Sequence, residues 1–233
     1  MMIYRKLGFL LVGLLISSQS MAAFTLNGTR FIYEGGSKNS SFEVTNHATD
    51  MWGGQVWIDN VSLPTDTVTL IPAPTFFKVD GEQKQVVRVL NVNDSVLPKD
   101  KESLFRLNVQ EIPPAPKTGN NVLSLAMNTQ VKLLYRPEAL KAGRSDAEKQ
   151  LRLEQRGGNS VLVNPTPYYF AVMKLYAGAS DKAPVIPTSA QSTEALNTLA
   201  PHTEVSLGKT VTLPITMTAV DDYGANRNYT LEK

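Results

Sequence analysis

Side chains of alternating polarity recur along this chain, and this period limits its fold more than any other feature. Successive side chains of a β-strand point to opposite faces, so an apolar residue at every second position is typical of a half-buried strand. The alternating runs contain Phe42 and Val44, Val56 and Ile58, Val87 and Val89, Phe105, Leu107 and Val109, and the odd positions from 123 to 133. Turn-forming clusters such as Asp80-Gly81 separate these runs. The pattern predicts an all-β sandwich.

The alternation lapses after Pro137 and then resumes, which indicates two domains. Residues 138–149 are polar and charged without alternation, as in a linker or a short helical turn. A second strand-rich block covers 151–175 and 209–217, and we interpret residues 178–205 as loops with one weak strand. The chain length suits two domains of about 100 residues each. The expected domains are 23–140 and 141–233.

The first residues are typical of a secretory signal peptide. Arg5 and Lys6 precede an apolar run from Leu7 to Ile16, and small residues follow. A positive start, a short apolar stretch and an A-x-A-like site mark such a signal. The run is well short of the ~20 apolar residues that span a bilayer. We expect residues 1–22 to be removed by cleavage after Ala22.

Charge and cysteine content exclude several classes of protein. The chain has 23 Lys and Arg against 21 Asp and Glu, and the signal holds two of the bases, which leaves 21 of each sign (23 − 2 = 21). A neutral chain gives no electrostatic reason to expect nucleic-acid binding. Cysteine is absent, which excludes disulfide scaffolds, thiol catalysis and metal sites with Cys ligands.

Catalytic motifs are missing from the sequence as well. The two histidines, His47 and His202, lie in different expected domains. No nucleophile elbow, HExxH pair, phosphate-binding loop or dinucleotide fingerprint occurs. We therefore expect no enzyme activity, no catalytic residue, no metal, no cofactor and no small-molecule substrate.

One long motif carries more information than the rest of the chain. Residues 97–113 read LPKDKESLFRLNVQEIP and resemble the signature of the periplasmic pilus-assembly chaperones, the PapD/FimC family. The matching positions are Leu97, Pro98, Asp100, Lys101, Glu102, Ser103, Leu104, Asn108, Val109, Ile112 and Pro113. The sequence departs at Arg106, where the family usually carries an aromatic residue, so we expect one packing contact on that strand face to be weaker. Residues 27–33, 131–137, 164–169 and 221–225 resemble further family marks, so the resemblance spans nearly the whole mature chain.

This resemblance implies both a fold and a function. The implied fold is two immunoglobulin-like β-sandwich domains in an L- or boomerang-shaped arrangement. The implied function is that of a periplasmic chaperone, which binds, folds and caps fimbrial subunits by donor-strand complementation and delivers them to an outer-membrane usher. The short connection between residues 113 and 122 resembles the branch of the family that mostly serves rod-like adhesive fimbriae.

Leu123, Leu125 and Met127 share one face of the last alternating run. From the alternation alone, burial in the core of their own domain is the favoured interpretation. The resemblance instead assigns them to a donor strand, whose apolar side chains enter the groove of a subunit. Burying each of them fully would contribute roughly 1.5–3 kcal/mol.

Two basic residues complete the binding site that the resemblance implies. It places Arg30 and Lys132 in the cleft between the domains, where they bind the C-terminal carboxylate of the subunit. A guanidinium fork and a compact ammonium both suit that group. Lys132 is even-numbered whereas the donor residues are odd, so we expect a bulge or a strong twist between them if both serve one ligand.

The resemblance also implies an interdomain salt bridge. It joins Glu102, Arg136 and Asp222 across the domain interface and holds the two domains at a fixed angle. Without the resemblance, the three residues would be taken as unconnected surface charges, whose ion pairs are typically weak.

Two questions stay open at the level of the sequence. The alternative function is a secreted two-domain immunoglobulin-like adhesion or structural protein of the fimbria. Fimbrial subunits commonly have a cysteine pair and a single incomplete domain, whereas this chain has no Cys and two sets of strands. The second question is whether the free chaperone forms a dimer that caps its own donor strand.

Overall fold

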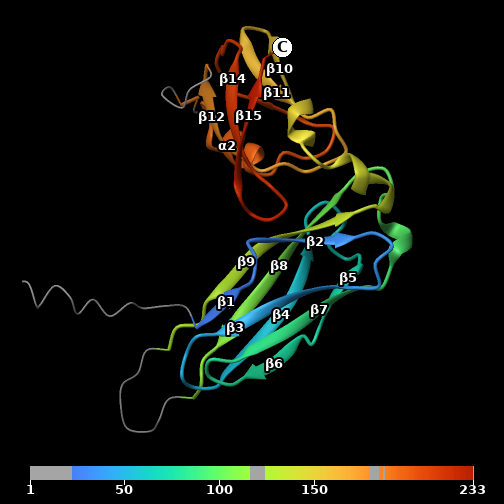
Figure 1. The fold of residues 1–233 in the computed structure, drawn as a ribbon, viewed down its shortest axis with the longest axis vertical. Coiled ribbons are helices and arrows are strands. Elements are labelled where there is room, and N and C mark those ends of the chain that lie inside the picture. Colours follow the sequence, from blue (N-terminus) through green and yellow to red (C-terminus); the bar gives the residue numbers. More distant parts are fainter. Residues whose placement is uncertain (1–22, 116–123, 179–183, 186, 233) are drawn as a thin grey trace, which may run out of the picture.

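The computed structural model describes residues 23–115, 124–178, 184–185 and 187–232. They form two β-sandwiches that follow one another along the chain, and the long axes of the two meet at an angle (Figure 1). The prediction of an all-β, two-domain protein is therefore confirmed. No helix among the described residues is long and apolar enough to cross a membrane.

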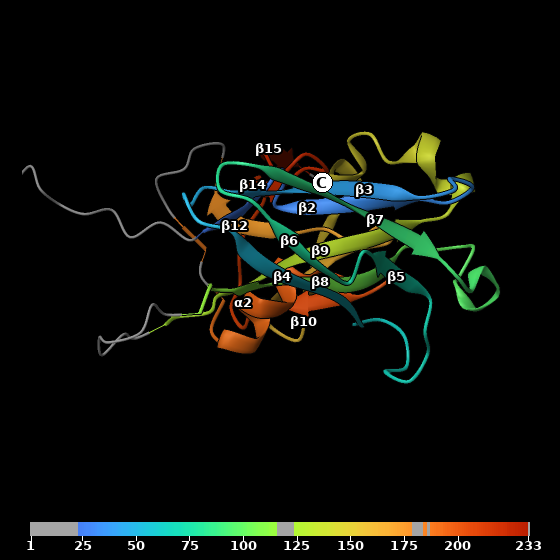
Figure 2. The same cartoon turned by 90° about the horizontal axis from the view of Figure 1, so that it is seen from below.

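The N-terminal sandwich consists of two sheets that pack face to face (Figures 1 and 2). The first sheet contains, in spatial order, β1 (Phe24–Leu26), β3 (Ser40–Asn46), β7 (Lys84–Asn91) and β5 (Leu70–Ala73). The second contains β2 (Arg30–Glu34), β9 (Asn128–Arg136), β8 (Ser103–Ile112), β4 (Trp52–Asn60) and β6 (Phe76–Val79). A short 3-10 helix, η1 (Asp94–Val96), precedes β8.

The core of this sandwich contains the alternating residues predicted from the sequence. Phe42, Val44 and Val87 enter it from the first sheet, and Phe105 and Leu107 enter it from the second. Each of these side chains is 1% exposed or less. Burial of this apolar surface, at about 25 cal/mol per Å², is the main force that holds the two sheets together.

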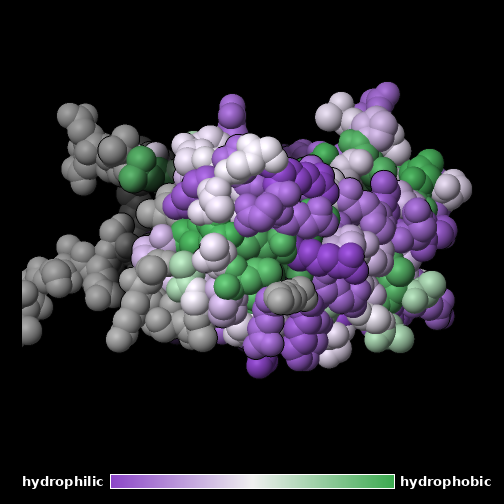
Figure 3. Space-filling view, turned by 90° about the horizontal axis from the view of Figure 1, so that it is seen from above, coloured by the Kyte–Doolittle hydropathy of each residue, from purple (hydrophilic) through white to green (hydrophobic). Residues whose placement is uncertain are grey.

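The C-terminal sandwich has two three-stranded sheets around its own core. One sheet contains β10 (Arg152–Arg156), β11 (Asn159–Val163) and β13 (Glu204–Ser206). The other contains β12 (Val172–Ala177), β14 (Ile215–Val220) and β15 (Asn226–Leu231). Seen from the end of this domain, hydrophilic side chains surround a hydrophobic area near the centre of the view (Figure 3).

The interpretation of residues 178–205 as loops with one weak strand was wrong in one respect. This region contains a helix, α2 (Ala190–Asn197), in addition to the short strand β13. Ser189 caps the helix, since its side chain accepts a hydrogen bond from the backbone of Ser192. Only Leu196 of the helix is buried, so the helix has no apolar stripe that could have revealed it.

Two 3-10 helices connect the sandwiches, η2 (Glu138–Gly143) and η3 (Ala147–Gln150). The loop between β14 and β15 returns to the N-terminal domain and packs beside Thr29. Gly224 in this loop has a φ of +84°, and a Cβ atom there would collide with the Thr29 side chain. Only glycine permits this backbone conformation and this close approach together.

Candidate functional site

The edge of β9 changes its surroundings part-way along the strand. From Lys132 onward β2 pairs with it in parallel, with Arg30 opposite Lys132. Before Lys132, no described strand pairs with β9 on that side, while β8 pairs with it on the other. The backbone N–H of Glu111 donates to the Met127 carbonyl at 2.8 Å. The ladder with β8 therefore extends beyond the start of β9 and leaves one edge open.

The apolar residues that precede β9 lie outside the core of their own domain. Leu125 is 69% exposed and Met127 is 51% exposed. They have the same parity as Leu133 and Tyr135, which are buried in that core. The apolar face of the strand thus continues past the end of the sandwich into solvent. Leu123, the third predicted donor residue, lies outside the described residues.

The bulge expected between the apolar residues and Lys132 is absent from residues 128–135. Each of these residues pairs with β8 in an unbroken register from Asn128 to Tyr135. The other form of the expectation, a strong twist, stays a prediction, and within this register the two sets of side chains lie on opposite faces of the strand. The odd positions face the core of the sandwich, and the even positions, which include Lys132, face the C-terminal domain.

Arg106 belongs to this second face and not to the core. It lies opposite Lys132 on β8 and is exposed, whereas its neighbours Phe105 and Leu107 are fully buried. The expected loss of a packing contact therefore does not affect the hydrophobic core.

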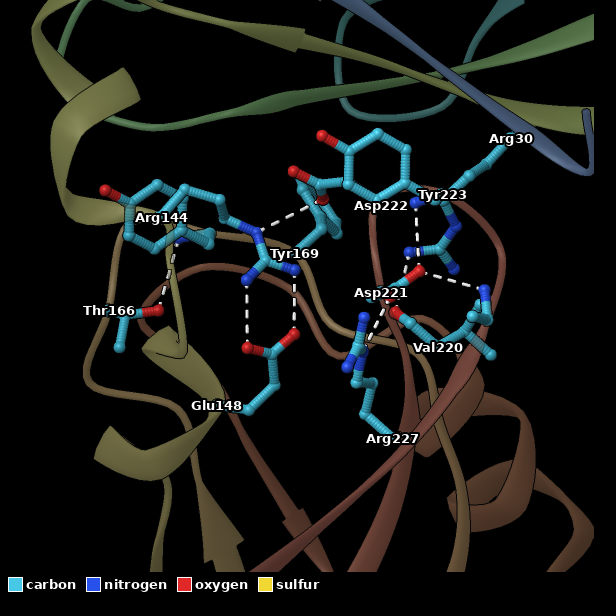
Figure 4. A network of polar contacts seen from close by, with 12 residues as sticks. Arg30, Arg144, Glu148, Thr166, Tyr169, Val220, Asp221, Asp222, Tyr223 and Arg227 are labelled. Atoms are coloured by element: carbon cyan, nitrogen blue, oxygen red, sulfur yellow. Dashed lines mark hydrogen bonds and ion pairs between the residues drawn. The ribbon is translucent and has the colours of Figure 1, made fainter.

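Arg30 and Lys132 lie side by side in the cleft between the domains. The Arg30 guanidinium donates to the carbonyl of Val220 at 3.0 Å, as Figure 4 shows. The Lys132 ammonium donates to the carbonyl of Asn197, at the end of α2. Neither residue has a carboxylate within ion-pair distance among the described residues. Two neighbouring cations are thus held by neutral acceptors of the C-terminal domain.

The electrostatics of this pair favour the arrival of an anion. Burial, and then the charge of Arg30, lower the pKa of Lys132 to about 8. Burial also lowers the pKa of Arg30, although Asp222 opposes this effect. An unpaired buried charge is costly, and an anion between the two groups would reduce that cost.

A groove leads along the same face to Lys132. Its volume is about 520 Å³, and it lies between strands β8 and β9 of one domain and helix α2 of the other. Its lining includes Arg106, Gln130, Lys132, Gln191, Glu194 and Thr198. Lys132 is therefore accessible from an opening that both domains form, and Arg30 lines a small separate pocket that also includes Lys132.

The three charged residues predicted at the interface contact one another directly. Arg136 Nε donates to Glu102 at 2.7 Å, and its two terminal nitrogens donate to both oxygens of Asp222 at 2.7 and 3.1 Å. Glu102 also accepts from the backbone of Tyr169 at 2.7 Å. Glu102 and Arg136 lie in the N-terminal domain, and Asp222 and Tyr169 lie in the C-terminal domain. The contacts of Arg136 and Glu102 thus cross the interface.

Burial sets the protonation of this group. It raises the pKa of Glu102, and the charge of Arg136 only partly opposes the rise. Burial would also raise the pKa of Asp222, but hydrogen bonds from Arg136 and the charge of Arg144 lower it overall. Arg136 is therefore the cation on which both carboxylates depend.

A second ion pair at the interface was missed in the sequence. Arg144 forms a bidentate pair with Glu148 at 2.9 and 2.7 Å, and it approaches Asp222 to 3.3 Å (Figure 4). Its guanidinium also lies over the rings of Tyr168 and Phe170, at 5.8 and 5.3 Å from their centres. The spacing of four residues between Arg144 and Glu148 is the available signal, and the short helical turn expected as one alternative for this segment is present, but the sequence gives the pair no role at the interface.

Comparison with known proteins decides the family. Residues 23–141 match the N-terminal domain of the PapD pili and flagellar-assembly chaperones, and residues 146–231 match the C-terminal domain of the PapD pili-assembly chaperones. The chain belongs to this family. The assignment based on residues 97–113 is therefore confirmed, whereas the exact boundary after residue 140 stays a prediction.

Individual relatives agree with the family. The chain is 45% identical to the chaperone protein FanE of Escherichia coli over 93% of each chain. It is similar to the solved periplasmic chaperone SfaE, with 28% identity, a TM-score of 0.69, and 90% and 100% of the two chains covered. It shares its fold with the Salmonella enterica chaperone SafB, solved in complex with the pilin SafA, at 21% identity and a TM-score of 0.72 over 92% and 99% of the chains.

These matches establish a chaperone of pilus assembly. The family is one of chaperones and not of enzymes. The alternative, an adhesion or structural protein of the fimbria, is not favoured, because the named relatives are chaperones. Within the described residues, no three His, Asp or Glu side chains are grouped so that they could hold a metal ion.

Proposed function

We propose that this protein binds fimbrial subunits in the periplasm by lending them the open edge of β9, and then delivers them to an outer-membrane usher. One observation carries the proposal. A strand edge that no described strand covers bears exposed Leu125 and Met127 and ends beside two cations, Arg30 and Lys132, whose hydrogen-bond partners among the described residues are neutral. An open apolar edge is an aggregation hazard unless a partner covers it, so its presence indicates a binding surface.

The edge supplies both affinity and selectivity. A subunit strand that pairs with β9 completes backbone hydrogen bonds, and alternate apolar side chains fill pockets of the subunit. Because β2 already pairs with β9 in parallel on this edge, a subunit strand in the same orientation directs its C-terminal end at Arg30 and Lys132. The same edge is also the surface through which two free chaperones would cap each other.

Arg30 and Lys132 are proposed to bind the terminal carboxylate of the subunit. The guanidinium offers a planar fork of donors and the ammonium a compact charge. A charged anchor fixes the register of the added strand, which backbone pairing alone specifies poorly. Glu102, Arg136 and Asp222 are proposed to support this anchor by holding the two domains at the angle that forms the cleft.

The cellular location and the absence of catalysis belong to the same proposal. Residues 1–22 are proposed to direct export, with cleavage after Ala22, so that the mature protein acts in the periplasm. Subunit capture by strand pairing forms and breaks no covalent bond. We therefore expect no enzyme activity and no requirement for ATP or a cofactor.

The test is co-purification of this chaperone with a fimbrial subunit from the periplasm. We expect a one-to-one complex, and we expect Arg30→Met or Lys132→Met to reduce subunit recovery at least tenfold. Charge-assisted hydrogen bonds contribute about 1.5–3 kcal/mol each, and Met keeps the packing of the aliphatic stem. Lys84→Met is the matched control, because this exposed lysine lies on the opposite sheet. Full recovery with both cleft variants would contradict the anchor.

A further inference from the structure

A buried carboxylate lies at the end of β8, away from the cleft. Glu111 is 2% exposed, and its side chain accepts a hydrogen bond from the backbone N–H of Phe24 at 2.8 Å. Phe24 is the first residue of β1 and is 3% exposed. The Glu111 carboxylate therefore links the C-terminal end of β8, in one sheet, to the N-terminal end of β1, in the other sheet.

The contacts of Glu111 do not balance its charge. Its only side-chain hydrogen bond among the described residues comes from a neutral backbone amide, and no described Lys, Arg or His lies within 4.0 Å of it. The other two buried carboxylates among the described residues are paired, Glu102 with Arg136 and Glu148 with Arg144. Burying a carboxylate without a cation costs several kcal/mol in real proteins. A positive group is therefore expected beside Glu111.

Ala23 offers such a group once the signal peptide is removed. It is 7% exposed, belongs to the hydrophobic core cluster, and its carbonyl accepts from the backbone of His47 at 2.7 Å. The backbone nitrogen of Ala23 lies one residue before that of Phe24, which donates to Glu111. Consecutive Cα atoms are about 3.8 Å apart, so the Ala23 nitrogen lies close to the same carboxylate. Cleavage after Ala22 converts the Ala23 nitrogen from a neutral amide into an ammonium.

We propose that Glu111 is the binding site for the α-ammonium of the mature N-terminus at Ala23. Signal cleavage then creates a buried ion pair that the precursor lacks. The backbone N–H of Glu111 donates to Met127, so the ion pair also fixes the point where the open edge leaves the sandwich. Processing would thus complete the N-terminal domain at the base of its donor edge.

The experiment compares the mature chain with one that carries an additional Gly-Ser before Ala23, each with Glu111 or with Glu111→Gln. Gln keeps the oxygen that accepts from Phe24 and removes only the charge. We expect the extension to lower the folding equilibrium constant about tenfold, or about 1.4 kcal/mol, when residue 111 is Glu. When it is Gln, the extension should change the constant less than twofold. An equal effect in both backgrounds would overturn the proposal, because it would indicate steric disturbance.

A second measurement does not depend on the stability of the Gln variant. The pKa of the Ala23 α-ammonium, followed by NMR in the mature protein, should lie above the usual value of about 7.7–8.0. Burial alone would lower this pKa, whereas a carboxylate partner raises it. His47 contacts Thr25 through its ring at 2.7 Å and Ala23 through its backbone at 2.7 Å, so His47→Gln serves as the control. An α-ammonium pKa at or below the usual value would also overturn the proposal.

The proposal rests on the cleavage position given above. The intact mass of the exported protein identifies the first residue before either experiment. A different N-terminus would refute the cleavage position, whereas a correct N-terminus without coupling to Glu111 would refute the ion pair alone.

Discussion

Lys132 shows how a single side chain can be prepared for a ligand. It lies beside Arg30 in the parallel pairing of β2 and β9, and its ammonium contacts only the Asn197 carbonyl among described residues. Burial and the neighbouring charge both disfavour its charged form, which lowers its pKa to about 8. At neutral pH the free chaperone therefore holds an unfavourable charge that a carboxylate would stabilise.

This lowered pKa predicts a pH dependence of stability. The pKa of Lys132 is about 8 in the folded protein and about 10.4 in an unfolded chain. Between these values the unfolded state binds one more proton, so stability rises with pH. We expect the free energy of unfolding of the native protein to increase from pH 8 to 10 relative to that of Lys132→Met. Urea unfolding of both proteins measures this difference, and a constant difference across that range would contradict the assigned pKa.

The carbonyl acceptors of the cleft show what the sequence could not reveal at this scale. Arg30 and Lys132 were identified through a motif, but their partners, Val220 and Asn197, were not. Every residue has a backbone carbonyl, so no residue type marks the ones that the fold turns toward a cation. The charged residues of the site were thus predictable, and their neutral partners were not.

At the scale of elements, the alternation predicts burial well in one half of the run from Leu125 to Tyr135, which begins before β9, and poorly in the other half. Leu133 and Tyr135 are buried, as the alternation predicts. The same alternation favours burial of Leu125 and Met127, which are exposed. Alternation indicates which side chains lie on the same face of a strand. It does not indicate where the sheet that covers this face ends. Only the family motif distinguished the two halves, because the period of the strand is the same in both.

The two halves of this run should respond differently to substitution. Leu125→Glu should change the free energy of unfolding by less than about 0.5 kcal/mol, because the site is exposed, yet it should strongly reduce capture of a subunit. Leu133→Ala, on the same face of the chain and 0% exposed, should cost about 2–5 kcal/mol. Thermal unfolding and periplasmic co-purification test both variants. A Leu125→Glu protein as unstable as Leu133→Ala would show that Leu125 belongs to the core.

At the scale of the whole molecule, buried charges connect the two sandwiches. Arg136 bonds to Glu102 in its own domain and to Asp222 in the other, and Glu102 in turn accepts from Tyr169. The arrangement is directional, since each hydrogen bond requires a particular position of the partner domain. Apolar contact alone would permit sliding, and we propose that these bonds hold the two domains at a fixed angle.

Removal of the central cation should therefore be costly. Arg136→Ala leaves two carboxylates without their main partner, and breaking a buried pair in this way costs about 3–5 kcal/mol. Arg156→Ala is the matched control, because its pairs with Glu154 and Glu204 are exposed at the surface and should contribute about 0–1 kcal/mol. Urea unfolding measures the stability of both, and small-angle scattering should show a wider range of interdomain angles only for Arg136→Ala. Equal losses in the two variants would contradict a special role for Arg136.

β2 pairs in parallel with β9 from Lys132 to Arg136, and this pairing has a further consequence. β2 begins at Arg30, directly opposite Lys132. A subunit strand that pairs with the same edge before Lys132 therefore meets the start of β2 end-on. An internal segment of a protein would have to turn away at that point, whereas a free chain end can stop there. If a subunit binds at this edge as proposed, the geometry would discriminate the last residues of a polypeptide from any similar stretch in its interior, whatever their sequence.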